Sequence, residues 1–72
     1  MNLDDRQFLR AIGNRIRDRR TARRLTQADL AAACGLHRTF IGSVERGERN
    51  VSVLNLRRIA RHLRVPLADL MG

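Results

Sequence analysis

Residues 27–46 read QADLAAACGLHRTFIGSVER, and this pattern predicts two short helices joined by a tight turn. The hydroxyl of Thr26 can cap a helix that opens at the start of this stretch, and the alanine-rich segment that follows favours helix. Gly35 is expected to end it, because glycine enters the left-handed conformation freely. The next helix begins near His37 and ends at Gly47. Because so few residues separate the two helices, they must cross closely, as in a helix-turn-helix.

The apolar residues of this stretch recur at helical spacing and divide it into a buried and an outward side. A small core between these two helices and the helix before them is expected at Leu30, Cys34, Leu36, Ile41 and Val44. Ala31 is small enough to permit the close crossing. We expect the following residues to point outward: Arg38, Thr39, Gly42, Ser43 and Arg46. This outward set is the candidate binding surface.

Three further helices are predicted around this pair. Asp4 and Asp5 suit the start of a first helix, whose apolar face is Phe8, Leu9, Ile12 and Ile16. Ser52 is expected to cap a fourth helix that buries Leu56, Ile59, Ala60 and Leu63. Pro66 suits the first position of a short fifth helix carrying Leu67, Leu70 and Met71. No segment alternates with a period of two, so we predict an all-α, five-helix fold forming a single domain over residues 1–72.

The composition narrows the class of function. The chain has 72 residues, with fifteen Arg and no Lys against seven acids, and a formal net charge of +8. A chain this short has little room for a large enzyme cleft, and its acids are scattered, so we predict no enzyme activity. The positive charge indicates an anionic partner, which could be nucleic acid, a membrane surface or an acidic protein.

Other classes of site are disfavoured by the residues present. Cys34 is the only cysteine, so no intrachain disulfide is possible, and a reducing cytoplasmic location is expected. His37 and His62 lack zinc-site spacing, so no metal or cofactor is predicted, and no small-molecule ligand is indicated. The longest apolar run, residues 30–34, is far shorter than the roughly 18 residues that span a bilayer.

Four motifs, occurring in order over roughly residues 10–71, resemble the lambda-repressor-like, Cro-type helix-turn-helix family. They are Ile12-Gly13-x-Arg15-Ile16-Arg17, Leu25-Thr26-Gln27-x-x-Leu30-Ala31, Val44-Glu45-Arg46-Gly47 and Val65-Pro66-Leu67-x-x-Leu70. The strings at residues 36–41 and 45–50 are especially similar to controller proteins of restriction–modification operons. This resemblance implies a homodimeric transcriptional regulator, acting as a repressor or an activator, that reads a palindromic operator in double-stranded DNA. The third helix of each subunit would enter the major groove.

The resemblance also assigns roles to matching residues. Base contacts would come from Arg38, Thr39 and Ser43. Phosphate contacts would come from Gln27, Arg17, Arg46, Arg49 and Asn50. The planar fork of Arg38 suits guanine O6 and N7. A structural ion pair is implied between Arg20 in the first helix and Glu45 at the end of the third.

Three residues depart from the family pattern. Arg19 replaces a leucine that is usually buried, Arg24 replaces a glycine after the first helix, and His37 replaces a serine or threonine cap. The end of the first helix is therefore the part of the fold that the resemblance determines least. For His37, a phosphate contact and a plain position at the start of the helix remain alternatives.

The C-terminal residues 64–72 are expected to contribute to the dimer interface through Leu67, Leu70 and Met71. Leu67 and Met71 suit the core of an isolated domain equally well, but so small a domain gains burial from a second copy. RNA polymerase is a further candidate partner.

Two alternative functions remain open at this stage. One is an antitoxin-type protein-interaction module whose DNA binding is secondary; such proteins usually carry an extra toxin-binding segment, and this chain ends at Gly72. The other treats residues 6–24 as a basic amphipathic helix for a membrane surface or for RNA. The second conflicts with the need for the apolar face of this helix in the core.

Overall fold

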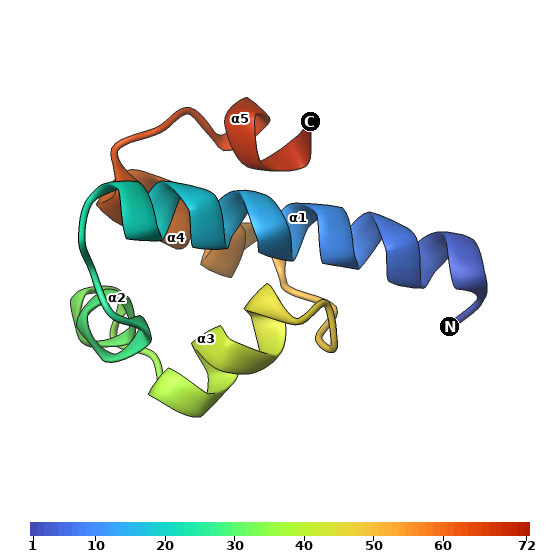
Figure 1. Cartoon of the computed structure of the whole chain (residues 1–72), viewed down its shortest axis with the longest axis horizontal. Coiled ribbons are helices and arrows are strands. Elements are labelled where there is room, and N and C mark those ends of the chain that lie inside the picture. The colour runs from blue at the N-terminus through green and yellow to red at the C-terminus, as the bar shows by residue number, and fades with distance from the viewer.

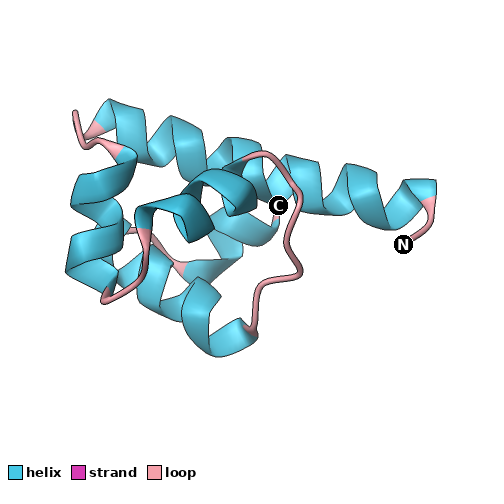
Figure 2. Ribbon diagram, turned by 90° about the horizontal axis from the view of Figure 1, so that it is seen from below, coloured by secondary structure: helices cyan, strands magenta, loops and turns pink.

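Five helices and the loops between them make up the whole chain in the computed structural model, which describes residues 1–72 (Figures 1 and 2). The helices are α1 (Leu3–Ala22), α2 (Gln27–Cys34), α3 (Arg38–Glu45), α4 (Val53–Leu63) and α5 (Leu67–Met71). There is no strand (Figure 2). The predicted all-α, five-helix fold is confirmed.

The long helix α1 separates two parts of the molecule. Helices α2 and α3 lie on one side of it and α5 lies on the other, while α4 packs against α1, α2 and α5 (Figure 1). As a result α3, the candidate recognition helix, lies at an edge of the molecule away from α5.

Local capping explains most of the helix boundaries. Thr26 accepts a hydrogen bond from the backbone N–H of Asp29, and the Asp29 carboxylate accepts one from the backbone N–H of Thr26, forming a capping box. Gly35 ends α2 at φ +68°, as expected. Ser52 caps α4 as predicted. Pro66 lies one position before the predicted one, as the N-cap of α5 rather than its first residue.

The start of α1 depends on a residue just before the predicted acidic start at Asp4 and Asp5. Asn2 is the N-cap, and its side chain accepts from the backbone N–H of Asp5. Asp4 and Asp5 lie in the first turn, where their charge suits the helix dipole, as predicted.

The two unusual arginines near the end of α1 have different environments. The helix ends at Ala22, and Arg24 adopts φ +58°, the left-handed conformation that glycine adopts most easily. Arg19, which replaces a usually buried leucine, is only partly buried. The helix therefore keeps its length despite both departures, with backbone strain at Arg24.

Twelve buried apolar residues form one core: Ile12, Ile16, Leu30, Ala31, Cys34, Ile41, Val44, Leu56, Ile59, Ala60, Leu63 and Leu70. The buried side of α1 closes this core, which removes its apolar face from any membrane. Phe8 is an exception to the predicted face because half of its surface is exposed. No helix combines the length and apolarity that crossing a bilayer requires.

Leu70 requires a correction. We expected it at the dimer interface, but it is fully buried in the core of a single chain. The short helix α5 packs against both α1 and α4, so its one inward-facing leucine is covered by this chain. Leu67 is partly buried against the core, and Met71 remains 42% exposed.

Two glycines allow α1 to approach the end of α3. A Cβ on Gly13 would lie 2.5 Å from the carbonyl oxygens of Val44 and Glu45. Gly47, at φ +74°, faces the backbone of Arg10, where a Cβ would lie 2.8 Å from the Arg10 Cα. These contacts place one face of α1 directly beside the turn that follows α3.

Candidate nucleic-acid interface

The amino end of α3 projects two exposed polar side chains, Arg38 and Thr39. His37 is the N-cap, and its Nδ1 accepts from the backbone N–H of Thr39 at 3.1 Å. The same nitrogen lies 2.7 Å from the Thr39 hydroxyl. His37 thus replaces the usual hydroxyl cap and orients Thr39, while Arg38 has no ion-pair partner within the chain.

The middle of α3 is less exposed than the helical pattern predicted. Gly42 and Ser43, which we expected to point outward, are both buried, and Ser43 is only 8% exposed. The Ser43 hydroxyl donates to the Phe40 carbonyl at 2.7 Å. Because α3 packs against both α1 and α2, only its amino end remains accessible, and exposure returns at Arg46, the residue that follows the helix. The expectation of an outward-facing Ser43 was wrong.

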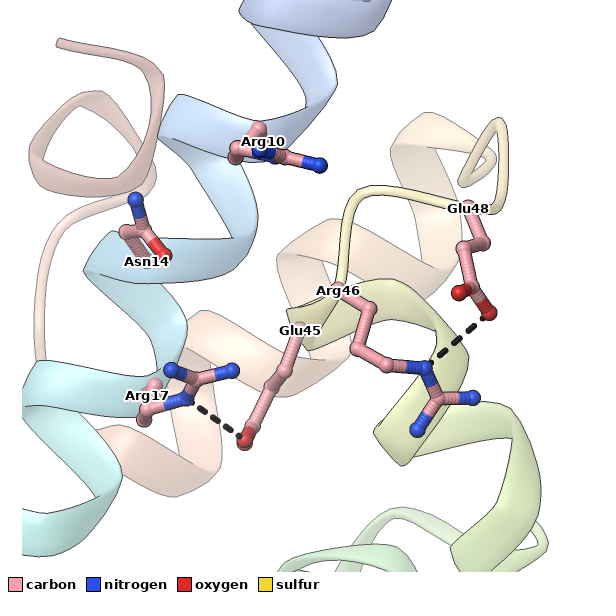
Figure 3. A pocket seen from close by; sticks show the side chains of 6 residues that line it. All are labelled: Arg10, Asn14, Arg17, Glu45, Arg46 and Glu48. Carbon is pink, nitrogen blue, oxygen red and sulfur yellow. Dashed lines mark ion pairs between the residues drawn. The ribbon is translucent and has the colours of Figure 1, made fainter.

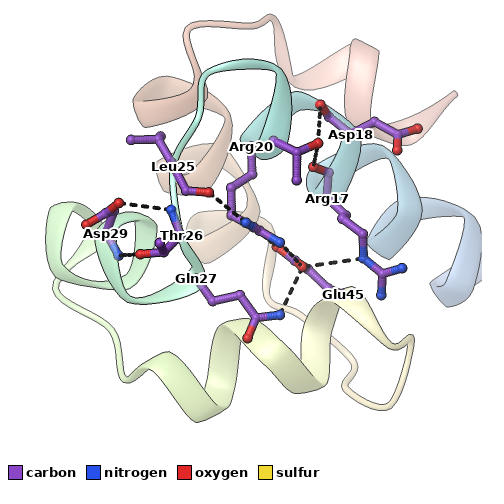
Figure 4. A network of polar contacts seen from close by, with 9 residues as sticks. Arg17, Asp18, Arg20, Leu25, Thr26, Gln27, Asp29 and Glu45 are labelled. Atoms are coloured by element: carbon purple, nitrogen blue, oxygen red, sulfur yellow. Dashed lines mark hydrogen bonds and ion pairs between the residues drawn. The ribbon is translucent and has the colours of Figure 1, made fainter.

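Arg20 of α1 forms a buried ion pair with Glu45, the last residue of α3 (Figure 4). Arg20 Nε donates to Glu45 Oε2 at 2.6 Å and Arg20 Nη2 to Oε1 at 2.9 Å, while Nη1 donates to the Leu25 carbonyl. The hydrogen bonds to Glu45 raise the pKa of the Arg20 guanidinium, although burial acts to lower it. The structure contains the implied pair, and its bidentate geometry fixes α1 against the end of α3.

Two candidate phosphate-binding residues converge on the same carboxylate. Gln27 Nε2 donates to Glu45 Oε1 at 3.1 Å, and Arg17 Nε lies 3.6 Å from that oxygen (Figure 4). Glu45 is fully buried, whereas the side chain of Arg17 is 48% exposed. Glu45 therefore holds Gln27 and Arg17 beside each other with part of the Arg17 head facing solvent.

The turn after α3 carries the other candidate phosphate contacts. Arg49 and Asn50 are exposed, and the Arg49 guanidinium lies 5.7 Å from the centre of the Phe40 ring. Arg46 Nε lies 3.1 Å from Glu48 Oε1, with both side chains more than half exposed. The turn thus presents two arginines and one acid to solvent.

A polar cleft of about 330 Å³ joins this turn to α1 (Figure 3). Its lining consists of Arg10, Asn14, Arg17, Glu45, Arg46 and Glu48. The motifs in the sequence did not identify Arg10, Asn14 or Glu48 as site residues. The spacing of Arg10, Asn14 and Arg17, four and then three residues apart, puts them on one face of a helix and was an available signal.

A separate apolar groove lies at the carboxyl end of the chain. It is lined mainly by apolar residues of α1 and α4, by the segment between α3 and α4, and by Met71 of α5. Three of these apolar residues, Phe8, Val53 and Met71, are each at least 42% exposed. This groove is the part of the surface near α5 that can bury apolar area against another molecule.

Cys34 has no features of a nucleophile. Its side chain is buried, and burial raises the pKa of its thiol. The thiol form therefore predominates at neutral pH, in agreement with the predicted role of Cys34 as a core residue.

Comparison with known proteins gives consistent matches. A helix-turn-helix family model matches residues 16–70. The control protein C.BamHI of Bacillus amyloliquefaciens is 42% identical over 60 residues, covering 82% of this chain and 74% of that protein. The control protein C.SmaI of Serratia marcescens is also 42% identical over 60 residues, covering 83% and 71%. The crystal structure of the restriction-modification controller protein C.AhdI from Aeromonas hydrophila superposes with a TM-score of 0.84 at 44% identity, covering 86% of this chain and 94% of that one.

Proposed function

This chain belongs to the helix-turn-helix family of DNA-binding transcriptional regulators, and we propose that it is a homodimer controlling a restriction–modification operon. The similar proteins named as control proteins support the operon assignment, as does the likeness to a restriction-modification controller over nearly all of that structure. The regulated operon would then encode a methyltransferase or an endonuclease beside this protein.

The observation that carries the proposal is the exposed amino end of α3, a helix whose carboxyl end is held against α1 by the Arg20–Glu45 pair. Arg38 would read guanine through O6 and N7. Thr39 would contact a base through its hydroxyl, or the methyl group of thymine through its own methyl group. Because the hydroxyl of Ser43 is engaged inside α3, the proposed base-reading set is Arg38 and Thr39. The buried ion pair fixes the angle at which these residues are presented.

Phosphate contacts would surround this reading helix on both sides. The residues proposed for them are Gln27, Arg17, Arg46, Arg49 and Asn50, all of which retain some exposure. Such contacts set the position of the protein on the duplex without conveying sequence information.

A second copy of the chain would occupy the apolar groove beside α5. Met71, Phe8 and Val53 supply exposed apolar surface there, whereas Leu67 is partly buried against the core. A two-fold pair would place both copies of α3 in successive major grooves, about 34 Å apart, on a palindromic operator. RNA polymerase and the nucleoid remain expected partners of such a regulator.

No observation favours the antitoxin alternative. The alternative in which residues 6–24 bind a membrane surface conflicts with the burial of Ile12 and Ile16.

Selection from a random duplex library tests the proposal. We expect enrichment of an inverted repeat with half-sites about one helical turn apart. Enrichment of only single half-sites would remove the dimer from the proposal, and no enrichment would remove sequence-specific binding.

Met71→Glu, measured by analytical ultracentrifugation, should weaken self-association without unfolding the domain.

A further inference from the structure

The polar cleft between α1 and the turn after α3 has a charge arrangement that suits an anion (Figure 3). Arg10, Asn14 and Arg17 approach it from α1, and Arg46 and Glu48 approach it from the turn. The fully buried carboxylate of Glu45 at its base is already paired with Arg20. Three arginines therefore face one accessible acid, Glu48.

The chemistry of this lining excludes an ordinary small-molecule site. Pockets for organic ligands are lined mostly by apolar and aromatic side chains, and this cleft has none. At the end of α3, Ser43 O and Val44 O accept hydrogen bonds from the backbone N–H groups of the turn, so these two carbonyls are already paired. Charged and amide donors on two walls instead match a phosphate group.

We propose that this cleft holds a backbone phosphate of bound DNA, and that Glu48 competes with this phosphate for Arg46. The proposal rests on the proposed DNA-binding function and adds Arg10 and Asn14 to its phosphate contacts. In the free protein the Glu48 carboxylate holds the Arg46 guanidinium at 3.1 Å. When DNA binds, the phosphate replaces that carboxylate.

The position of the cleft supports the assignment. It lies beside the carboxyl end of α3, and a helix in the major groove has a sugar–phosphate strand along each edge of that groove. The close approach at Gly13 and Gly47 fixes the distance between the two walls. The Arg46–Glu48 pair is more than half exposed, so exchanging its carboxylate for a phosphate has a small energetic cost.

The consequence is that Glu48 lowers affinity for all DNA sequences alike. Removing its charge should release Arg46 and also remove repulsion between Glu48 and the phosphate. This acid would therefore limit nonspecific binding by a chain of net charge +8. It would leave base discrimination by Arg38 unchanged.

Fluorescence anisotropy of the full chain on a random-sequence duplex, between about 50 and 200 mM NaCl, tests the proposal. We expect Glu48→Gln to tighten binding by about three- to ten-fold at low salt. Asp18→Asn is the matched control: it changes the net charge equally, but Asp18 is an exposed residue of α1 that does not line the cleft and lies outside residues 64–72. Equal effects of the two variants, or weaker binding by Glu48→Gln, would overturn the proposal.

The same Glu48→Gln substitution, made in a chain that already carries Arg46→Ala, tests whether Glu48 acts through Arg46. In an Arg46→Ala chain, Glu48→Gln should tighten binding less than it does in the unaltered chain, because the side chain for which Glu48 competes is gone and only the relief of repulsion remains. A full effect in that background would contradict the competition. If the unaltered chain fails to bind any duplex, the proposed function itself fails, whereas failure of these variants alone leaves that function standing.

Discussion

Two Arg–Glu ion pairs lie at the end of α3, and they differ in burial. Glu45 of the first pair is the last residue of α3, and both members of the second pair lie in the turn that follows. Arg20–Glu45 is buried and bidentate, with Glu45 also bonded to Gln27. Arg46–Glu48 has a single close contact at 3.1 Å and is more than half exposed. If its arginine partner were removed, a buried carboxylate would have no water to hydrogen-bond with, whereas an exposed carboxylate would be solvated. The first pair therefore maintains the fold, and the second is free to exchange partners.

The largest expected effect is from Glu45→Gln. Removing one member of a buried pair leaves Arg20 without its counter-charge and should lower the free energy of unfolding by about 3–5 kcal/mol. That loss is comparable with the whole stability of a domain this small. Urea unfolding followed by circular dichroism measures it. Glu48→Gln is the control and should stay within about 0.5 kcal/mol, so similar losses in both variants would abolish the contrast between the pairs.

The next effect concerns exposed arginines that face DNA. Arg38→Ala should weaken binding to a selected operator by about 1–3 kcal/mol while leaving random-sequence binding nearly unchanged. Arg49→Ala should weaken both and reduce the salt dependence of binding. Titrations of each variant on both duplexes measure these differences. Equal losses on operator and random DNA for Arg38→Ala would show that it contacts phosphate rather than a base.

A smaller effect on stability is expected at Arg24, an exposed arginine in a strained backbone conformation. Arg24→Gly should raise the free energy of unfolding by about 0.5–1 kcal/mol, because relief at φ +58° exceeds the added freedom of the unfolded chain. Arg23→Gly is the matched control: its φ of −95° suits any residue, so it should only destabilise. Thermal unfolding compares the two variants. Destabilisation by both would show that Arg24 makes a stabilising contribution that outweighs its strain.

The smallest effect concerns an exposed acid that is bonded locally. The hydrogen bond from the backbone N–H of Thr26 lowers the pKa of Asp29 below its usual value of 3.8. A lowered pKa in the folded state means that the contribution of Asp29 is present above pH 3.8 and is lost as the pH falls through the folded-state value. Asp29→Asn should therefore flatten the decline of the melting temperature below about pH 4. If the melting temperature of Asp29→Asn declined at low pH as steeply as that of the unaltered chain, the capping box would add nothing measurable to stability.

The sequence predicted well wherever local interactions decide the structure. The cap at Thr26, the stop at Gly35 and the cap at Ser52 involve residues within three or four positions of each other. Helix periodicity likewise identified nearly all of the core. The cap by His37 was left open, because imidazole is an unusual replacement for a hydroxyl at that position.

Exposure was predicted less well than local structure. Helical periodicity placed Ser43 outside, yet α3 is covered by two neighbouring helices. It also left Leu70 available to a partner, although α5 folds back onto α1 and α4. A single helix pattern describes one inward face and cannot represent a helix that is buried on more than one side.

By itself, the sequence determined five helices, the caps at Thr26 and Ser52 and the helix-turn-helix crossing, because backbone hydrogen bonds and capping groups act over a few residues. Only the tertiary structure brought Gln27 and Arg17 to Glu45, and Arg10 and Asn14 to the turn that carries Glu48. Those residues belong to separate helices whose approach depends on two glycines and on the buried core. Charge and residue type indicated DNA, but which arginines are held in the fold and which remain free to bind it was decided by burial.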